Sequence, residues 1–310
     1  MNKLIYVFLL FSLYSCIENK KKESHLNGFD ISPDAENIVF SYKKDSLYRI
    51  YTKSINDGKK SVIFEGSGNY VNPKYVNNGK TIVALYYPYN TLIPEFHFYN
   101  LATHKLSKKI KLGEGFISDY ILSTSNKMFY LQAKTFQSYS PIVPKAYHDF
   151  DIYELDLVTL EYKRISNLKA YSMQEILNME GDSLLVSMQG KYSDESGLFF
   201  VNKVSSMKEE GILNKIWIKN DTLRNSTMYA NPVILPNNQI LCASSYQMVM
   251  LDLKSNKEFP VLPSNGYHYN IIRNVNNLVF YQRSDRTDDI YFFNLKDKNI
   301  NLIKIVSDKD

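Results

Sequence analysis

Short apolar runs alternate with polar turns along most of the chain. Each run has six or seven residues, is rich in Val, Ile, Leu, Phe and Tyr, and follows a turn that contains Pro, Asp, Asn or Gly. Runs of this length and composition, bounded by turn residues, predict β-strands. They recur at residues 37–42, 81–87, 127–133, 183–189, 239–245 and 277–283.

Each of these runs occupies the same place in a larger unit. A first strand precedes the turn, at 28–36, 72–80, 118–126, 173–181, 231–239 and 270–277. A third strand follows, at 47–55, 95–103, 149–157, 197–204, 247–255 and 289–297. A short fourth strand completes the unit; in the fourth unit the candidate is 214–221. Six copies of four strands predict an all-β fold, a six-bladed β-propeller of four-stranded antiparallel blades.

The repeat also sets the expected domain boundaries. We expect a leader over 1–15, a modified Cys16 with a flexible tether over 16–26, and the propeller over 27–308. The expected blades cover 27–67, 70–114, 116–169, 172–222, 228–266 and 268–307. Because the chain begins with a first strand and ends with a fourth, we expect apolar face packing to close the ring. An added edge strand from residues 17–27 is the alternative.

One segment carries a family resemblance. The stretch DISPDAENIVFS, with Ser32, Pro33 and Asp34 in its turn, resembles the WD40-like repeat of the TolB β-propeller family. Ile50 and Tyr51 in RIYTKSI match the later strand of that repeat. The resemblance covers about residues 27–307 at blade level and weakens along the chain. It implies the propeller fold and protein partners in the cell envelope, while no partner-binding motif is carried over.

The first residues read as a secretion signal. Lys3 precedes an apolar run from Leu4 to Tyr14, which is shorter than the roughly twenty residues that a spanning helix needs. The sequence LYSC then resembles a bacterial lipobox, in which the Cys becomes the lipidated mature N-terminus. We therefore expect a lipoprotein anchored through Cys16, with a plain signal peptide as the alternative.

The expected location is the cell envelope. The Lys-, Asn- and Tyr-rich composition resembles that of lipoproteins of the Bacteroidetes group. In some of these an acidic run after the Cys directs export to the cell surface, whereas here Glu18 is followed by lysines at 20–22. We expect an outer-membrane anchor facing the periplasm.

The cysteine content and the net charge limit the functions that the sequence predicts. The only other cysteine, Cys242, lies in an apolar run and is predicted to be a buried core residue. The formal charge of +5 comes from scattered lysines and arginines, so we expect no nucleic-acid partner. We also expect a monomer.

Motifs for catalysis are missing from the sequence. It contains no Gly-x-Ser-x-Gly, no phosphate-binding Gly loop, no His-Glu-x-x-His and no Cys-x-x-Cys. His97 and His104 are seven residues apart, a poor spacing for a shared metal. We expect no cofactor, no metal site and no enzyme activity.

Two features could still touch a ligand. Residues 134–151 lengthen the link between the second and third strands of the third unit to about thirteen residues, on the face around the channel mouth. Its candidate contact residues are Tyr139, Tyr147, His148 and Asp149. His148 and Asp149 are expected to point to opposite faces, as neighbours in an extended chain do. Packing of these aromatics against neighbouring blades is the alternative.

Carboxylates on the first strands are the second feature. Asp30, Asp119 and Glu175 could project toward the channel, where a pair could serve a glycosidase, although solvated wall groups are the simpler interpretation. Taken together, the sequence predicts a non-enzymatic binding or adaptor module for a protein, peptide or glycan. The alternatives are a glycan lyase or hydrolase at the channel and a purely structural scaffold without a pocket.

Overall fold

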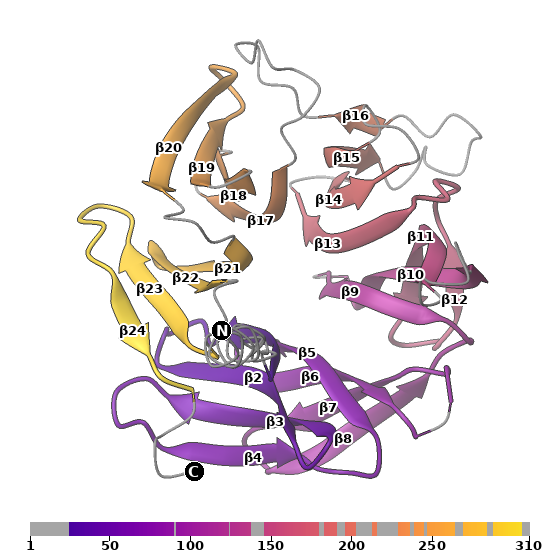
Figure 1. Cartoon of the computed structure of the whole chain (residues 1–310). Helices are drawn as coiled ribbons and strands as arrows, with labels where there is room; N and C mark the ends of the chain where they lie inside the picture. Colours follow the sequence, from indigo (N-terminus) through magenta and orange to yellow (C-terminus); the bar gives the residue numbers. More distant parts are fainter. Residues whose placement is uncertain are drawn as a thin grey trace, which may run out of the picture.

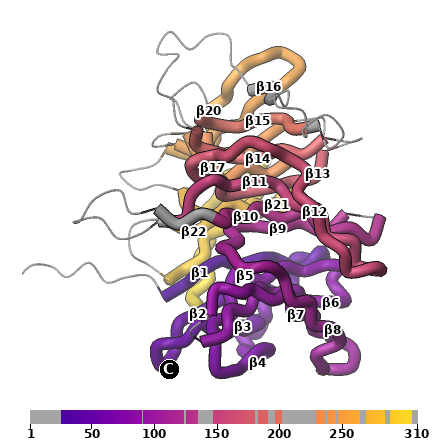
Figure 2. Tube along the Cα trace, turned by 90° about the vertical axis from the view of Figure 1, so that its right-hand side faces the viewer, coloured from indigo at the N-terminus to yellow at the C-terminus, as the bar shows by residue number. Residues whose placement is uncertain are grey.

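The protein forms a ring of six β-sheets around a central channel (Figure 1). The structure, a computed structural model, describes residues 25–89, 91–123, 125–137, 146–179, 183–190, 196–202, 213–215, 229–235, 239–244, 247–263, 269–283 and 288–305. In the side view, β1 to β8 lie on one side of the ring and β20 lies on the opposite side (Figure 2). The predicted all-β, six-bladed propeller is confirmed.

Each sheet is one blade, and its four strands pair antiparallel in chain order. Blade 1 contains β1 (Leu26–Ile31), β2 (Asn37–Lys44), β3 (Leu47–Ser54) and β4 (Lys60–Phe64). Blade 2 contains β5 (Asn69–Val76), β6 (Thr81–Tyr87), β7 (Glu95–Asn100) and β8 (Lys105–Lys111). Blade 3 contains β9 (Phe116–Leu122), β10 (Lys127–Gln137), β11 (Ala146–Asp156) and β12 (Tyr162–Arg164).

The remaining three blades follow the same plan. Blade 4 contains β13 (Ser172–Asn178), β14 (Ser183–Gln189), β15 (Gly197–Asn202) and β16 (Leu213–Lys215). Blade 5 contains β17 (Tyr229–Leu235), β18 (Gln239–Ser244), β19 (Gln247–Asp252) and β20 (Lys257–Pro263). Blade 6 contains β21 (Tyr269–Val275), β22 (Leu278–Arg283), β23 (Ile290–Asn294) and β24 (Asn301–Ile303). β16 overlaps the start of the candidate fourth strand 214–221, whose remainder lies outside the described residues.

Turn residues explain the first hairpin of several blades. Asn77 and Asn78 both have φ near 53°, and Asn276 and Asn277 have φ of 52° and 65°. Two consecutive positive φ values are the requirement of a type I′ turn, whose twist matches that of the flanking strands. Asparagine tolerates this left-handed region better than most residues. The polar turns seen in the sequence therefore fix where the first hairpin reverses in blades 2 and 6.

Apolar packing between blades holds the ring together. Buried side chains form six clusters, and each cluster joins two neighbouring blades. The second strands feed two clusters at once: Ile38 and Phe40 face blade 6, while Val39 between them faces blade 2. Side chains on both faces of a strand are buried, which is why these runs are almost continuously apolar.

The seam between blades 6 and 1 uses the same packing. Phe29, Phe40 and Ile31 of blade 1 contact Phe280 and Ile290 of blade 6 in one cluster. Every described strand pairs within its own blade, so no strand crosses the seam there. The predicted closure by apolar faces is confirmed for the described residues, and β1 begins at Leu26; residues 17–24 lie outside them.

Hydrogen bonds reinforce the seam at the start of β1. The Asp288 carboxylate accepts from the backbone N–H of His25 at 2.7 Å and from the Tyr42 hydroxyl at 3.4 Å. The Asn276 amide donates to the Pro33 carbonyl at 3.3 Å. These contacts join residues more than two hundred positions apart in sequence, so they tie the first blade to the last.

Every innermost strand carries a β-bulge. The pairing of first and second strands shifts register once in each of the six blades. The residues skipped by the pairing are Asn27–Gly28, Asn72–Pro73, Ser118, Gln174, Asn231–Pro232 and Asn270. Gly28, Asn72 and Asn231 have φ of 88°, 50° and 53°. A bulge leaves residues unpaired and re-aims the side chains beside it, here around the channel.

Two further sequence expectations can be compared with the structure. Cys242 is fully buried between blades 4 and 5, which confirms it as a core residue, and burial raises the pKa of its thiol well above the usual value. Cys16 lies outside the described residues. Within the described part of the chain, no helix has the length and apolar character to cross a membrane.

Candidate functional site

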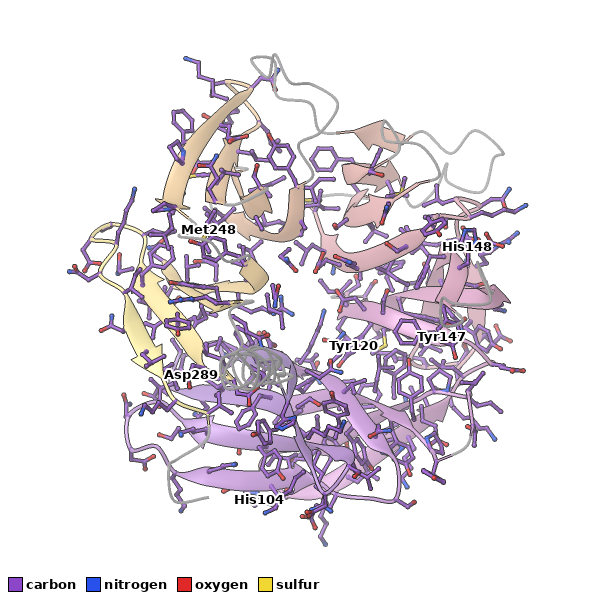
Figure 3. The ribbon with its side chains drawn as sticks, viewed as in Figure 1. His104, Tyr120, Tyr147, His148, Met248 and Asp289 are labelled. Atoms are coloured by element: carbon purple, nitrogen blue, oxygen red, sulfur yellow. The ribbon has the colours of Figure 1, made fainter. Side chains whose placement is uncertain are left out.

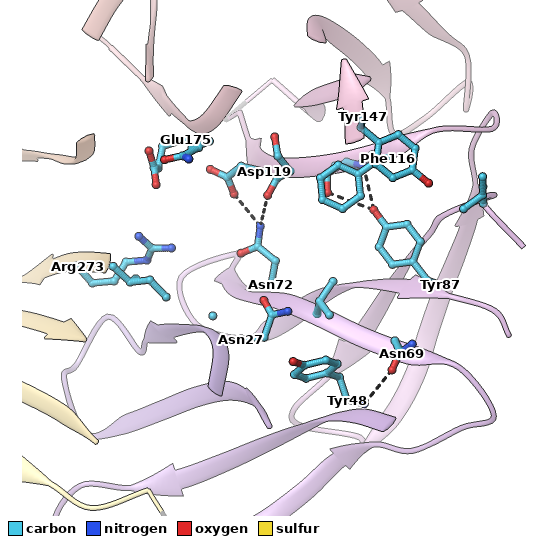
Figure 4. Close-up of a pocket in the computed structure, with 17 residues that line it drawn as sticks. Asn27, Tyr48, Asn69, Asn72, Tyr87, Phe116, Asp119, Tyr147, Glu175 and Arg273 are labelled. Atoms are coloured by element: carbon cyan, nitrogen blue, oxygen red, sulfur yellow. Dashed lines mark hydrogen bonds between the residues drawn. The ribbon is translucent and has the colours of Figure 1, made fainter. Parts of the chain in front are cut away.

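A cavity of about 410 Å³ opens where the first strands of blades 1 to 3 begin (Figure 4). Links between blades and links between second and third strands share this end of the ring. The cavity reaches from the channel wall to the starts of β3, β9 and β11. It is lined by Asn27, Gly28, Tyr48, Asn69, Val71, Asn72, Tyr87, Leu92, Phe116, Ile117, Ser118, Asp119, Tyr147, Gln174, Glu175, Ile271 and Arg273.

One side of the cavity is an aromatic wall formed by Tyr87, Phe116 and Tyr147. The Phe116 ring stacks on Tyr147, with centroids 4.9 Å apart, and on Tyr87 at 6.3 Å. The Tyr87 hydroxyl donates to the Ile117 carbonyl and accepts from the Ile117 N–H at 2.9 Å. The wall is therefore held in place by its own packing and hydrogen bonds, and its rings remain only half-buried.

The opposite side is charged, and Asp119 lies at its centre. Its Oδ1 atom accepts from Lys74 Nζ at 2.7 Å and from Asn72 Nδ2 at 2.9 Å. Its Oδ2 atom accepts from the backbone N–H of Ile176 at 3.1 Å. The three donors come from blades 2 and 4, so this buried carboxylate joins three blades. Lys74 also donates to the Tyr120 carbonyl at 2.6 Å.

Asp30 holds Arg273 at the edge of the cavity. Asp30 Oδ2 accepts from the backbone N–H of Tyr75 at 2.8 Å, and Oδ1 lies 3.5 Å from Arg273 Nε. Burial raises the pKa of Asp30, although the Arg273 charge opposes this. The pair joins blades 6, 1 and 2 across the seam, and Arg273 faces the cavity (Figure 4).

Glu175 is the least satisfied of the carboxylates. The backbone N–H of Asn231 donates to it, but its Oε2 atom is hidden from solvent and has no hydrogen-bond partner among the described residues. Burial, and secondly the nearby Asp119 carboxylate, raise the pKa of Glu175 to about 7. Glu175 therefore exchanges its proton near neutral pH, at the cavity wall.

The three predicted carboxylates do gather at the channel. Asp119 and Glu175 line the cavity, and Asp30 lies behind Arg273. Asp30 and Asp119 are not merely solvated wall groups, as the simpler interpretation expected. Each accepts a backbone N–H from the next blade, so both connect blades.

The predicted loop differs from its expected form. β10 and β11 pair as far as Gln137 and Ala146, so the link between them is residues 138–145 and not about thirteen residues. Continued strand pairing absorbs the rest of the segment. Tyr139 lies outside the described residues.

Only one of the other three loop residues lines the cavity. Tyr147 belongs to the aromatic wall, while His148 and Asp149 are not among the lining residues. The His148 Nδ1 atom lies 2.5 Å from Asp149 Oδ1, so the expectation that they point to opposite faces is wrong. Asp149 has φ of 60°, which breaks the alternation of an extended strand. His148 packs edge-on against Tyr171, and Figure 3 shows Tyr147 and His148 outward from Tyr120.

Histidines form no metal site in the described part of the chain, where no group of three or more potential ligands occurs. His97 is buried and bonded to the Tyr70 hydroxyl at 3.0 Å and to Glu95 at 2.8 Å. None of these three residues lines the cavity. His104 is exposed at a turn.

Several cavity residues had no clear signal in the sequence. Nothing in the local sequence pattern distinguishes Arg273, Asn72 or Phe116 from their neighbours. A polar residue at the bulge is a signal that does repeat from blade to blade, as Asn27, Asn72, Ser118, Gln174, Asn231 and Asn270.

No protein-family model and no curated protein matches the sequence. Solved propellers share its fold. An oligogalacturonate lyase from Vibrio parahaemolyticus aligns with a TM-score of 0.58 and 11% identity, over 92% of this chain and 78% of that one. The tricorn protease aligns with a TM-score of 0.63 and 16% identity, over 92% of this chain and 26% of that one.

A third solved propeller is also similar to this chain. The β-propeller domain of the Trilobed protease from Pyrococcus furiosus, described as having an open velcro topology, aligns with a TM-score of 0.56. Its identity is 11%, over 89% of this chain and 82% of that one. At these identities the likeness establishes the six-bladed propeller fold alone.

Proposed function

We propose that this propeller is a non-enzymatic binding module for a glycan, which it takes into the cavity at the channel mouth. One observation carries the proposal: a fixed aromatic wall of Tyr87, Phe116 and Tyr147 faces a wall of amides and charged groups across one cavity. Sugar rings present apolar C–H faces and a rim of hydroxyls, which such opposed walls complement.

The size of the cavity supports a small ligand or the end of a longer one. Its volume of about 410 Å³ falls at the lower end of the roughly 300–1,000 Å³ of small-molecule sites. A purely structural scaffold predicts no such pocket. A protein partner would be expected to use a broader surface than this concave one.

Amide side chains add the hydrogen bonding that hydroxyls need. Asn27, Asn69, Asn72 and Gln174 all line the cavity. An amide both donates and accepts, as a sugar hydroxyl does. The oligogalacturonate lyase also acts on a sugar, but at 11% identity that likeness adds no weight, and the proposal rests on the cavity.

Mutation of the aromatic wall tests this use of the cavity. Replacing Tyr147 by alanine is expected to weaken glycan binding about fivefold, because the loss of a stacking contact costs about 1 kcal/mol. The matched control is His148→Ala, the adjacent residue on β11 that lies outside the cavity. Calorimetric titration measures both. Equal losses in the two variants would count against the cavity.

A first experiment identifies the class of ligand. The domain from residue 17 serves as bait in gently solubilised envelopes, followed by mass spectrometry and glycan analysis of what it retains. Retained oligosaccharide supports the proposal. A specific protein partner without glycan would replace it with the adaptor function that the TolB resemblance implies.

The proposal includes a lipid anchor at Cys16 that holds the module at the outer membrane, facing the periplasm. It is supported by the basic start, the short apolar run and the LYSC sequence. Replacing Cys16 by serine is expected to move the protein from the membrane fraction to the soluble envelope fraction and to abolish labelling by a radioactive fatty acid. Persistence of both in the variant would exclude this anchor.

An enzyme is the second candidate, favoured by the proton-exchanging Glu175 beside Asp119. A carboxyl group that titrates near pH 7 suits general acid or base chemistry on a glycosidic bond. The products of incubation distinguish the two functions. Oligosaccharides returned shortened support a lyase or hydrolase, and oligosaccharides returned intact support binding alone.

A further inference from the structure

The charged side chains of the cavity differ in how much hydrogen-bonding capacity they retain. Both oxygens of Asp119 are occupied, by Lys74 and Asn72 on one side and the Ile176 N–H on the other. Both oxygens of Asp30 are occupied as well. The aspartates are therefore committed to holding the blades together, and a ligand meets little free charge on them.

Arg273 keeps hydrogen-bonding capacity on the side that faces the cavity. Its Nη1 atom donates to the Ile272 carbonyl at 2.9 Å, and its Nε atom makes a long contact of 3.5 Å with Asp30. Its third nitrogen, Nη2, has no partner in the parts of the chain that the structure describes. The side chain is about one-fifth exposed and lines the cavity. A guanidinium in this state is suited to a planar carboxylate, which it can bind through two nitrogens.

Glu175 keeps capacity as well. The backbone N–H of Asn231 donates to Glu175, and the Oε2 atom of Glu175 has no hydrogen-bond partner among the described residues. The last torsion of a glutamate is broad, so a modest rotation turns this oxygen toward the cavity that the side chain lines. A protonated carboxyl there is a donor without an acceptor, and burial without one is costly. Figure 4 places Glu175 and Arg273 together, across the cavity from Phe116 and Tyr147.

We propose that the glycan is acidic and that its carboxylate lies between the Arg273 guanidinium and the Glu175 carboxyl, while its ring lies along the aromatic wall. This inference rests on the proposed glycan-binding function and narrows it to sugars that carry a carboxylate, such as uronates or sialates. Arg273 supplies the charge, and Glu175 supplies one proton donor. Neutral sugars offer hydroxyls to both groups but no negative charge for Arg273.

The proposal implies that Glu175 takes up a proton when the ligand binds. The groups that face Glu175 are Asp119 from β9, Lys74 from β5, Arg273 from β21 and the Asn231 N–H from β17. A ligand carboxylate adds a second negative charge beside Glu175 and offsets Arg273, so it raises the pKa of Glu175 further. The ligand itself stays ionised, since sugar acids titrate at about 3 to 4, like other α-substituted carboxyls. Affinity should therefore increase as the pH falls from 8 to 6.

Paired probes test the inference. Trisaccharides of galacturonate, glucuronate and mannuronate, and sialyllactose, are each compared with their methyl esters by calorimetric titration at pH 6 and pH 8. The full protein is expected to bind at least one acid ten or more times tighter than its ester, and tighter at pH 6. Acids bound no better than their esters, with glycan binding intact, overturn the inference and leave the proposed function standing. No binding of any glycan overturns both.

Two variants test whether the ligand carboxylate contacts Arg273 and Glu175. Arg273→Lys keeps the charge beside Asp30 but loses the planar fork, and it is expected to remove most of the acid preference. Glu175→Gln mimics the protonated form, so it should keep the preference and lose the pH dependence. Arg164→Lys is the matched control, because Arg164 pairs with Asp151 at 3.6 Å, outside the cavity. Thermal melting confirms that each variant is folded.

Three results contradict the assignment. Unchanged acid preference in Arg273→Lys removes Arg273 from the site. An unchanged pH profile in Glu175→Gln removes Glu175. Binding of a tripeptide with a free C-terminal carboxylate, but not of its amide or of any acidic sugar, replaces the glycan by a peptide.

Discussion

Asp119→Ala is expected to lower the free energy of unfolding by about 3–5 kcal/mol, because removal of one partner leaves a buried charge uncompensated. The Lys74 ammonium loses its counter-ion, and the side chain of Lys74 is mostly buried. The Asn72 amide and the Ile176 N–H lose their acceptor at the same time. Denaturant unfolding measures the change. We also expect faster hydrogen exchange in β5 and β13, which Asp119 joins through β9.

A double variant separates charge from hydrogen bonding. Lys74→Met with Asp119→Leu removes both charges and should recover the part of the loss that comes from the stranded ammonium, since buried pairs often exchange for apolar residues at little cost. The Asn72 amide and the Ile176 N–H still lack an acceptor, so only part of the lost stability should be recovered. Glu36→Ala, at an exposed carboxylate, is expected to leave stability unchanged. A loss in Asp119→Ala no larger than in Glu36→Ala would refute the role of Asp119 as a link between blades.

Phe280→Ala is expected to weaken the ring at its seam and to lower the free energy of unfolding by about 3–5 kcal/mol. The Phe280 side chain is 1% exposed, stacks on Phe292 at 5.4 Å and packs in the cluster that joins blade 6 to blade 1. No described strand crosses this interface. Among the described residues, apolar packing and the hydrogen bonds of Asp288 and Asn276 join the two blades. Hydrogen exchange measured strand by strand should show β1 and β22 opening before the other blades.

The control is another Phe→Ala substitution, at an interface between two blades that are consecutive in sequence. Phe129 is 2% exposed and packs between blades 3 and 4, which are consecutive in sequence. Phe129→Ala should cost a similar free energy but leave exchange in β1 slow. If both variants release β1 equally, the seam is no weaker than the other interfaces, and the ring opens as one cooperative unit.

The blades could be predicted because their signals are local. An apolar run buried on both faces, such as Ile38 to Phe40, is visible in the sequence whatever it packs against. The turn at Asn77 and Asn78 likewise needs only two residues that tolerate positive φ. Repetition of these two signals specifies the propeller, because each blade alone cannot bury both of its faces.

The cavity could be predicted only in part because its contacts are not local. Asp119 and Ile176 meet across 57 positions of sequence, through the register of two different blades. The bulges shift that register, so counting along the strand does not tell which side chain faces the channel. Asp149 shows the same limit: one residue with positive φ reversed the expected direction of its side chain relative to His148.

The bulges bear on how such a fold changes over evolutionary time. A residue that the pairing skips forms no rung of the strand ladder, so at Ser118 and Gln174, where φ is not positive, a replacement costs the sheet little. In this ring these exchangeable positions lie on the innermost strands, where the cavity is formed. Binding chemistry can therefore drift while the blades persist. Solved propellers share this architecture at 11–16% identity, as such a separation predicts.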